Sequence, residues 1–307
     1  MRVLVTGGAG FIGATTAAAL CDAGHDVRVV DDLSTGHRDA VPEAASFVDA
    51  DVADQAALAA ALSDFAADAC IHFAARIEAG ESMTRPEQFF ATNVGATTRL
   101  LEVLVAHGVG RFVLSSTAAV YGETETATID EDTPARPTSP YGASKLAVED
   151  MLDWLHRLRG MAVASLRYFN AAGATPGRPE RHDPETHLIP RVLDVASGAA
   201  TSVTINGTDY STSDGTAIRD YVHVADLADA HVRAVERLDT LGHAVLNLGN
   251  GRGFSVREVI DAAERVTGRS IATIEGPRRP GDPARLVAAS DRAAEQLGWT
   301  PRRADIE

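Results

Sequence analysis

The sequence has little cysteine and few aromatic residues. Its 307 residues include 2 cysteines, and aromatic residues make up 5% of the chain. Two cysteines cannot build the disulfide framework of a small secreted domain or a cysteine-rich zinc site. Cys21 falls in an expected helix and Cys70 in an expected strand. We therefore expect two buried thiols and no disulfide.

Positive charge is also scarce. The chain has 28 Lys and Arg residues against 43 Asp and Glu residues, a formal net charge of −15. Such a surface repels nucleic acids and acidic membranes, so neither is expected as a partner. No apolar run approaches membrane-spanning length, and an expected strand beginning at Arg2 leaves no room for a signal peptide. These features predict a cytoplasmic protein with one large or two modest domains.

A glycine-rich turn follows the expected strand at 2–6. Gly7, Gly10 and Gly13 are three residues apart and open a helix expected over 11–23. A strand, a glycine turn and a helix start in this order form a cradle for the pyrophosphate of a dinucleotide. The spacing is one residue longer than Gly-x-Gly-x-x-Gly.

Acidic residues follow the next expected strand, about twenty residues beyond the turn. Asp31 and Asp32 can accept hydrogen bonds from a ribose 2′-hydroxyl. A carboxylate there would repel a 2′-phosphate, which favours NAD over NADP.

Tyr141 and Lys145 lie four residues apart, on one face of a helix expected over 140–159. A phenol titrates near ~10, so a neighbouring ammonium group would help it to act as a base. Alone, this pair is a weak signal and more often marks a solvated helix face. Beside a dinucleotide-binding turn, it predicts a proton-transfer pair.

Alternating strands and helices predict an α/β fold, a Rossmann-type doubly wound parallel sheet with a smaller C-terminal substrate-binding domain. The sheet domain would span 1–170, completed by about 220–248, and the substrate domain would span 171–307, interleaved with it. Residues 171–187 are rich in glycine, proline and charge, as expected of a loop over a ligand. The expected strands are 2–6, 27–31, 46–50, 69–73, 111–115, 162–168 and 244–248, and the expected helices are 11–23, 54–66, 86–107, 140–159 and 223–238.

The chain resembles the UDP-glucose 4-epimerases of the extended short-chain dehydrogenase/reductase superfamily almost from end to end. The glycine turn and Tyr-x-x-x-Lys identify only the superfamily. The stretches at 219–223, Arg-Asp-Tyr-Val-His, and 277–282, Pro-Arg-Arg-Pro-Gly-Asp, are more specific. Further matching stretches are 31–36, 72–75, 80–82, 93–94, 115–122, 141–145 and 166–170.

The resemblance implies that NAD stays bound throughout the reaction cycle. Tyr141 would take the proton of the sugar 4-hydroxyl while hydride passes from C4 to the nicotinamide, and Thr117 would hydrogen-bond O4. The 4-keto sugar would then turn over and take the hydride back on its other face. UDP-glucose and UDP-galactose would thereby interconvert.

The resemblance also implies binding positions, no metal, and a homodimer formed through the helices near 86–107 and 140–159. The implied NAD-binding residues are Gly7, Gly10, Phe11, Ile12, Gly13, Asp31, Asp32, Ser34, Thr35, Gly36, Asp51, Val52, Phe73, Ala74, Ala75, Asn93, Ser115, Tyr141, Lys145 and Tyr168. The implied UDP-sugar-binding residues are Thr117, Tyr141, Asn170, His187, Leu188, Arg219, Arg279 and Asp282, with the arginines on the diphosphate.

Other activities stay open at this point. Dehydratases of the superfamily carry an Asp-Glu pair after the catalytic Thr, where this chain has Ala118 and Ala119. This difference favours an epimerase over a dehydratase. A nucleotide-sugar reductase and a non-catalytic dinucleotide-binding regulator are further alternatives. Leu286 falls where the family gates the sugar pocket, and leucine leaves open whether N-acetylated sugars enter.

Overall fold

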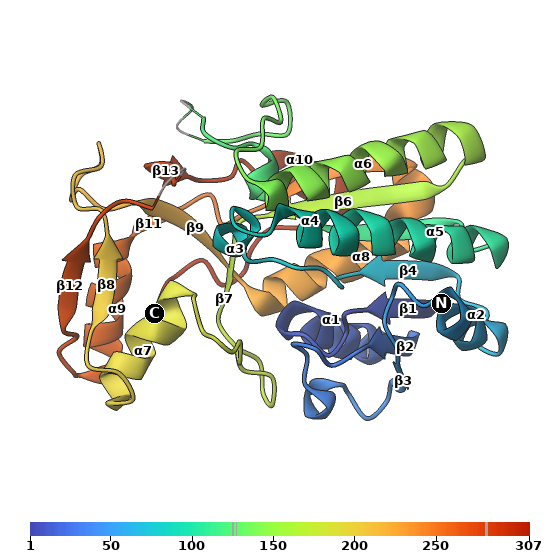
Figure 1. Ribbon diagram of the computed structural model, residues 1–307, viewed down its shortest axis with the longest axis horizontal. Helices are drawn as coiled ribbons and strands as arrows, with labels where there is room; N and C mark the ends of the chain where they lie inside the picture. Colours follow the sequence, from blue (N-terminus) through green and yellow to red (C-terminus); the bar gives the residue numbers. More distant parts are fainter. Residues whose placement is uncertain (125, 127, 280–281) are drawn as a thin grey trace.

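The protein is built on a parallel sheet (Figure 1). The computed structural model describes residues 1–124, 126, 128–279 and 282–307. Within them, seven strands pair in the order β10-β6-β5-β4-β1-β2-β3, and every neighbouring pair is parallel. The predicted Rossmann-type fold is confirmed. These strands are β1 (Arg2–Thr6), β2 (Asp26–Asp31), β3 (Ser46–Asp49), β4 (Ala69–His72), β5 (Arg111–Thr117), β6 (Ala162–Tyr168) and β10 (His243–Leu248).

Helices cover both faces of the sheet because successive side chains of a strand point to opposite faces. In β1, Val3 and Val5 join one apolar core, whereas Leu4 joins the other. The Val3 core includes residues of α1 (Phe11–Asp22), α8 (Val224–Leu241) and α10 (Asp291–Leu297), and the Leu4 core includes residues of α2 (Gln55–Ser63), α5 (Thr97–Ala106) and α6 (Pro140–Arg159).

Local sequence fixes the start and the end of α6. Ser139 is its N-cap and accepts a hydrogen bond from the Gly142 N–H (3.2 Å), and Pro140 occupies the first turn. The helix ends at Gly160, which adopts the left-handed conformation (φ +68°) that glycine tolerates. These signals place Tyr141 and Lys145 in the first two turns, as predicted.

The helix predicted over 86–107 begins and ends close to the expected residues but is not regular. It consists of α4 (Pro86–Phe89), a π-helical segment at Phe90–Ala96, and α5. The π-helical segment carries Asn93. Apolar periodicity cannot reveal a π turn, which is often found at functional sites.

A second region lies beyond the carboxyl ends of the strands, at the left of Figure 1. Val192, Val203 and Ile260 contribute to a separate small core there. A short helix, α3 (Ala79–Ser82), follows β4. The second region contains α7 (Leu188–Ser197), α9 (Val256–Thr267), the pair β8 (Val203–Asn206) and β12 (Thr273–Gly276), and a small sheet of β7 (Asn170–Ala172), β9 (Ile218–His223), β11 (Gly253–Ser255) and β13 (Arg285–Leu286).

The stretch 299–303 contacts the start of α8 before the C-terminus reaches the second region (Figure 1). Trp299 is buried and its indole N–H donates to the Asp226 carbonyl (2.8 Å). The Asp226 carboxylate accepts from the N–H groups of Arg302 (2.9 Å) and Arg303 (2.8 Å). His223 caps α8 by accepting from the Ala225 N–H (3.1 Å). Among the described helices, none is both long and apolar enough to cross a membrane.

Candidate active site

The predicted proton-transfer residues meet where β5 ends and α6 begins. The Lys145 ammonium group donates to the Ser115 carbonyl (2.9 Å), and the Thr117 hydroxyl lies close enough to the Tyr141 phenol to lower its pKa. Thr117 also accepts from the Ala119 N–H (3.1 Å), which fixes its hydroxyl at the strand end. The structure therefore brings Tyr141, Lys145 and Thr117 together.

Burial dominates the electrostatics of this pair. It raises the pKa of Tyr141 to about 12, with a further rise from Glu78 against the lowering effect of the Thr117 hydrogen bond. Burial also lowers the pKa of Lys145 to about 8, while Glu149 raises it. The protein alone thus keeps the phenol neutral, and the predicted help from Lys145 does not overcome burial. A base at Tyr141 needs further positive charge from a ligand.

The Asn93 side chain connects the segment after β4 to α6 by hydrogen bonds. Its amide donates to the Arg76 carbonyl (3.0 Å) and to the Ser144 hydroxyl (2.9 Å), and its carbonyl accepts from the Arg76 N–H (2.8 Å). This arrangement holds residues 73–75 beside the start of α6. On the other side of Lys145, the hydroxyls of Ser115 and Tyr168 are hydrogen-bonded.

The glycine turn can be tested against the predicted NAD cradle. A Cβ at Gly7 (φ +70°) would lie 2.4 Å from the Ala74 nitrogen, and one at Gly13 would lie 2.1 Å from the Gly7 carbonyl oxygen. Protein packing therefore requires both glycines. At Gly10 the nearest atom would be the Gly7 oxygen at 3.4 Å, an ordinary contact. Gly10 is the N-cap of α1 and provides no side-chain cap, so a pyrophosphate fits at this helix start.

The two aspartates predicted for the ribose differ. Asp31 is buried and accepts from the N–H groups of Ala9 and Leu33 (both 2.9 Å), so it also builds the turn. Burial raises its pKa, although the two backbone hydrogen bonds lower it. Asp32 is exposed and accepts from the Ser34 N–H (3.0 Å) and hydroxyl (2.6 Å). Both lie at the carboxyl end of β2 and can face a ribose.

The other predicted NAD residues lie along the same edge of the sheet. Phe11 and Ile12 open α1, Thr35 and Gly36 follow β2, and Asp51 and buried Val52 follow β3. Residues 73–75 follow β4, where the N–H groups of Phe73 (2.8 Å) and Ala74 (3.2 Å) donate to the Thr6 carbonyl. The carboxyl ends of parallel strands are the usual position of a dinucleotide in this fold.

The predicted substrate residues lie in the second region and at its border with the sheet. Arg219 on β9 forms an ion pair with Asp282, and it also donates to the Ile218 carbonyl (2.7 Å). Arg279 is exposed and donates through Nε (3.2 Å) and Nη2 (3.3 Å) to Asn206, with the Asn206 amide oriented to accept. Asn170 lies on β7, while His187 occupies the N-cap position of α7 and precedes Leu188.

A pocket of about 450 Å³ next to Asp282 contains residues that the sequence interpretation missed. Tyr210 and Thr124 carry buried hydroxyls with no hydrogen-bond partner among the described residues. Arg278 lies over the Tyr210 ring, 4.3 Å from its centre. Nothing local in the sequence singled out Tyr210. The other lining residues are Glu123, Asp209, Ser211, Pro283 and Ala284.

The loop after β7, within the stretch 171–187 that was predicted to cover a ligand, lies over the glycine turn. Arg178, Glu180 and His182 line one small cavity together with Gly10 and Phe11. The Arg181 side chain donates to the Asp39 carboxylate at 2.7 and 3.0 Å, the Arg178 Nε donates to the Ala40 carbonyl (3.0 Å), and His37 bonds the Arg181 carbonyl (3.2 Å). These contacts tie the loop to the cofactor side.

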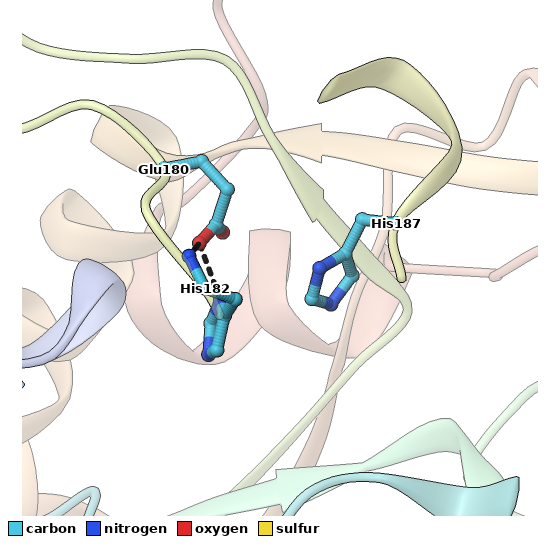
Figure 2. A group of neighbouring side chains, drawn as sticks. All are labelled: Glu180, His182 and His187. Carbon is cyan, nitrogen blue, oxygen red and sulfur yellow. Dashed lines mark hydrogen bonds and ion pairs between the residues drawn. The ribbon is translucent and has the colours of Figure 1, made fainter. Parts of the chain in front are cut away.

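Figure 2 shows Glu180, His182 and His187, a group with ligand atoms within 4.8 Å of one another. They could hold a metal ion, although the sequence predicted none. The Glu180 carboxylate points to the His182 ring, and this hydrogen bond raises the pKa of His182. The His187 ring lies 5.1 Å from that of His182 and bonds Glu185 (2.7 Å). Histidine–carboxylate pairs account for these contacts.

Comparison with known proteins decides the family. The sequence pattern described as "NAD dependent epimerase/dehydratase family" matches residues 3–249. A UDP-glucose 4-epimerase of Streptomyces lividans is 50% identical over 99% of this chain and 93% of that protein. The chain belongs to the NAD dependent epimerase/dehydratase family.

Solved structures agree with this family membership. UDP-glucose 4-epimerase from Brucella ovis, in complex with NAD, has a TM-score of 0.96 and 44% identity, covering 99% of this chain and 94% of that one. UDP-glucose 4-epimerase from Bifidobacterium longum, in complex with NAD⁺ and UDP, has a TM-score of 0.94 and 38% identity, covering 98% and 94%. This family member is an NAD-dependent enzyme, and its glycine turn fits that cofactor.

Proposed function

We propose that the chain interconverts UDP-glucose and UDP-galactose at C4 of the sugar, with Tyr141 as the acid–base residue. The observation that carries the proposal is the grouping of Tyr141, Thr117 and Lys145 at the end of β5, where Lys145 bonds the Ser115 carbonyl one helical turn after Tyr141. This group stands at the sheet edge that also carries the glycine turn. UDP-glucose 4-epimerases at 42–50% identity over nearly the full chain support the same activity.

Tyr141, Thr117 and Lys145 have different roles in the proposed reaction. Bound NAD supplies a hydride acceptor and donor for C4, so that the sugar passes through a 4-keto form. Tyr141 takes the proton of the 4-hydroxyl and later returns it, and Thr117 holds O4 through its hydroxyl. Ammonium charge at Lys145 and the positive charge of the ligand oppose the burial that raises the pKa of Tyr141. General acid–base help of this kind contributes roughly 10²–10⁴-fold.

The dehydratase alternative has less support. Ala118 and Ala119 form a short 3₁₀ turn directly after Thr117, and methyl groups cannot transfer protons. Elimination of water needs an acid and a base beyond Tyr141. Transfer and return of hydride at C4 needs no acid or base besides Tyr141.

We assign binding of the UDP part of the substrate to the second region. Arg219 suits a diphosphate oxygen, and Asp282 suits the ribose hydroxyls. Tyr210 and Arg278 line the pocket beside Asp282 and complete this assignment. Leu286, on β13, gates the sugar end and leaves room for activity on N-acetylated sugars as well.

The proposed assembly is a homodimer through the helical layer of α4, α5 and α6. Large apolar side chains stay exposed on it in the single chain: Phe90 (42%), Trp154 (58%) and Leu158 (74%). Exposed apolar groups on neighbouring helices favour a helix–helix interface. The cytoplasmic location and the division into the domains 1–170 with about 220–248 and 171–307 stay predictions.

The purified protein tests the activity directly. It is incubated with UDP-galactose and no added cofactor, and the product is identified by nuclear magnetic resonance. UDP-glucose is expected to form, because NAD copurifies and is regenerated in each turnover. A stoichiometric requirement for added NADPH would indicate a reductase, and no product at all would indicate a regulator.

A further inference from the structure

Helix α6 makes a third contact with the end of β5 beyond the two that involve Tyr141 and Lys145. Glu149 lies one helical turn after Lys145, so the three side chains lie on one face of the helix. Lys145 bonds the Ser115 carbonyl and Glu149 the Ser116 hydroxyl, while Tyr141 lies beside Thr117, the next residue of β5. The Glu149 carboxylate thus lies on the same helix face as Tyr141 and Lys145, next to the active site.

Glu149 is buried and firmly bound. Its side chain is 6% exposed, and it accepts two hydrogen bonds from the Nε of Arg167 (3.0 and 3.1 Å). Arg167 also donates to the Tyr121 hydroxyl (3.0 Å), which in turn donates to Asn247 (2.7 Å). Burial of two charges costs about as much as their attraction returns, so stability alone gives little reason for this pair.

Among the described residues, Glu149 is the carboxylate that acts on the Lys145 ammonium group. The imidazole that faces Lys145 from β4 stays neutral, because burial lowers the pKa of His72 to about 3. The nearby phenols also stay neutral, because burial raises the pKa of Tyr141 and of Tyr168. The titratable and charged groups around Lys145 are therefore Tyr141 and Glu149 on α6, His72 on β4, and Arg167 and Tyr168 on β6.

We propose that Glu149, held in place by Arg167, is a positioning residue that keeps a charged Lys145 beneath Tyr141 by facing it with a buried negative charge. Lys145 is desolvated and has one hydrogen-bond acceptor from β5. Without the carboxylate, the ammonium group would lose its proton at lower pH. Loss of that charge would remove the support for an ionised Tyr141. For its kinetic readout, the inference depends on the proposed epimerase function.

The test compares Glu149→Gln with Asp226→Asn, a matched control. Both changes replace a buried, arginine-paired carboxylate with an amide, but Asp226 lies in the first turn of a different helix, α8, and bonds Arg303. Epimerase activity is measured across pH for the wild type and both variants. Wild-type activity should fall as the pH rises through the pKa of Lys145, about 8. In Glu149→Gln this fall should move about one pH unit lower, and in Asp226→Asn it should not move.

A second readout needs no activity. The folded-state pKa of Lys145, about 8, lies below its unfolded value of about 10.4. The unfolded chain therefore binds more protons between these values, and the free energy of unfolding should rise with pH across that window. In Glu149→Gln the rise should begin at lower pH, as measured by urea unfolding at a series of pH values.

Two results would overturn the inference: an equal loss of activity at every pH, or the same shift in Asp226→Asn. Should Glu149→Gln fail to fold, the double variant Glu149→Met with Arg167→Leu removes both charges and leaves no unpaired one. It should show a downward shift that is smaller, because the positive charge of Arg167 is removed as well, and an unmoved profile would again overturn the inference. A wild type without epimerase activity would refute the proposed function, while the unfolding series would still test Glu149.

Discussion

The sheet edge and the second region hold their candidate residues in different ways. At the sheet edge, Lys145 (3% exposed) and Asn93 (2%) are buried and bond backbone groups of neighbouring strands or loops. In the second region, Arg219 pairs with the Asp282 side chain besides its bond to the adjacent Ile218 carbonyl, and Arg279 is exposed. Backbone contacts fix a position, whereas pairs of long side chains can re-form around a ligand. The chemistry is thus rigidly placed, and the nucleotide sugar is bound by groups that can adapt.

Tyr141→Phe should have the largest effect, because it removes the acid–base group at the rigid edge. Turnover is expected to fall roughly 10²–10⁴-fold. UDP binding, measured by isothermal titration calorimetry, should stay unchanged because the second region is untouched. Near-normal turnover would contradict the assigned base.

Two glycine substitutions separate fold from cofactor within the sheet region. Gly13→Ala should destabilise the protein by about 1–3 kcal/mol or more, because its Cβ meets the Gly7 carbonyl. Gly10→Ala should fold normally but lose bound NAD, because its Cβ clears the protein and would point at the ligand. Thermal unfolding and the absorbance of released NAD distinguish the two outcomes. Full NAD content in Gly10→Ala would place the pyrophosphate elsewhere.

Arg219→Leu should mainly weaken substrate binding. Loss of a charged hydrogen bond to a diphosphate corresponds to roughly a 10–100-fold rise in KM. The kcat should change much less, since Tyr141 and its neighbours keep their places. Arg191→Leu, on α7, is the control and should leave both constants near the wild-type values. A fall in kcat with constant KM would contradict the binding role and indicate that Arg219 contributes to the chemical step.

Glu180→Gln should give the smallest effect, confined to the loop over the glycine turn. The pKa of His182 is raised by Glu180, so the pair adds stability below about pH 6.5 that is lost as pH rises through the raised value. The substitution should therefore lower the free energy of unfolding by under about 1 kcal/mol at pH 5.5 and leave it unchanged at pH 9. A loss of equal size at both pH values would indicate packing instead of charge.

The sequence predicted the rigid region far better than the adaptable one. Buried parallel strands such as the one that contains Val3–Val5 are short apolar runs flanked by glycine or polar residues. The local sequence therefore shows where they begin and end. Tyr141 and Lys145 could be predicted as proton-transfer residues because both lie on one helix, where their spacing in the sequence fixes their relative position. By contrast, β9 pairs with β7, β11 and β13, which are far apart in the sequence. Tyr210 and Arg278 meet through the same long-range folding, so no local pattern could connect them.

Some roles depend on contacts that spacing does not encode. Asp31 was predicted for a ribose, yet both of its oxygens also bond backbone N–H groups. The strong burial of Tyr141, which opposes its ionisation, was likewise invisible in the spacing to Lys145.

UDP-galactose labelled with deuterium at C4 tests the central claim most directly. The purified protein converts it in ordinary water without added cofactor, and mass spectrometry and nuclear magnetic resonance locate the label in the UDP-glucose formed. Hydride that leaves C4 and returns to the same carbon on its other face never mixes with solvent, so the product should keep its deuterium at C4. Replacement of the label by solvent hydrogen would show that C4 loses a proton instead, and would contradict the account.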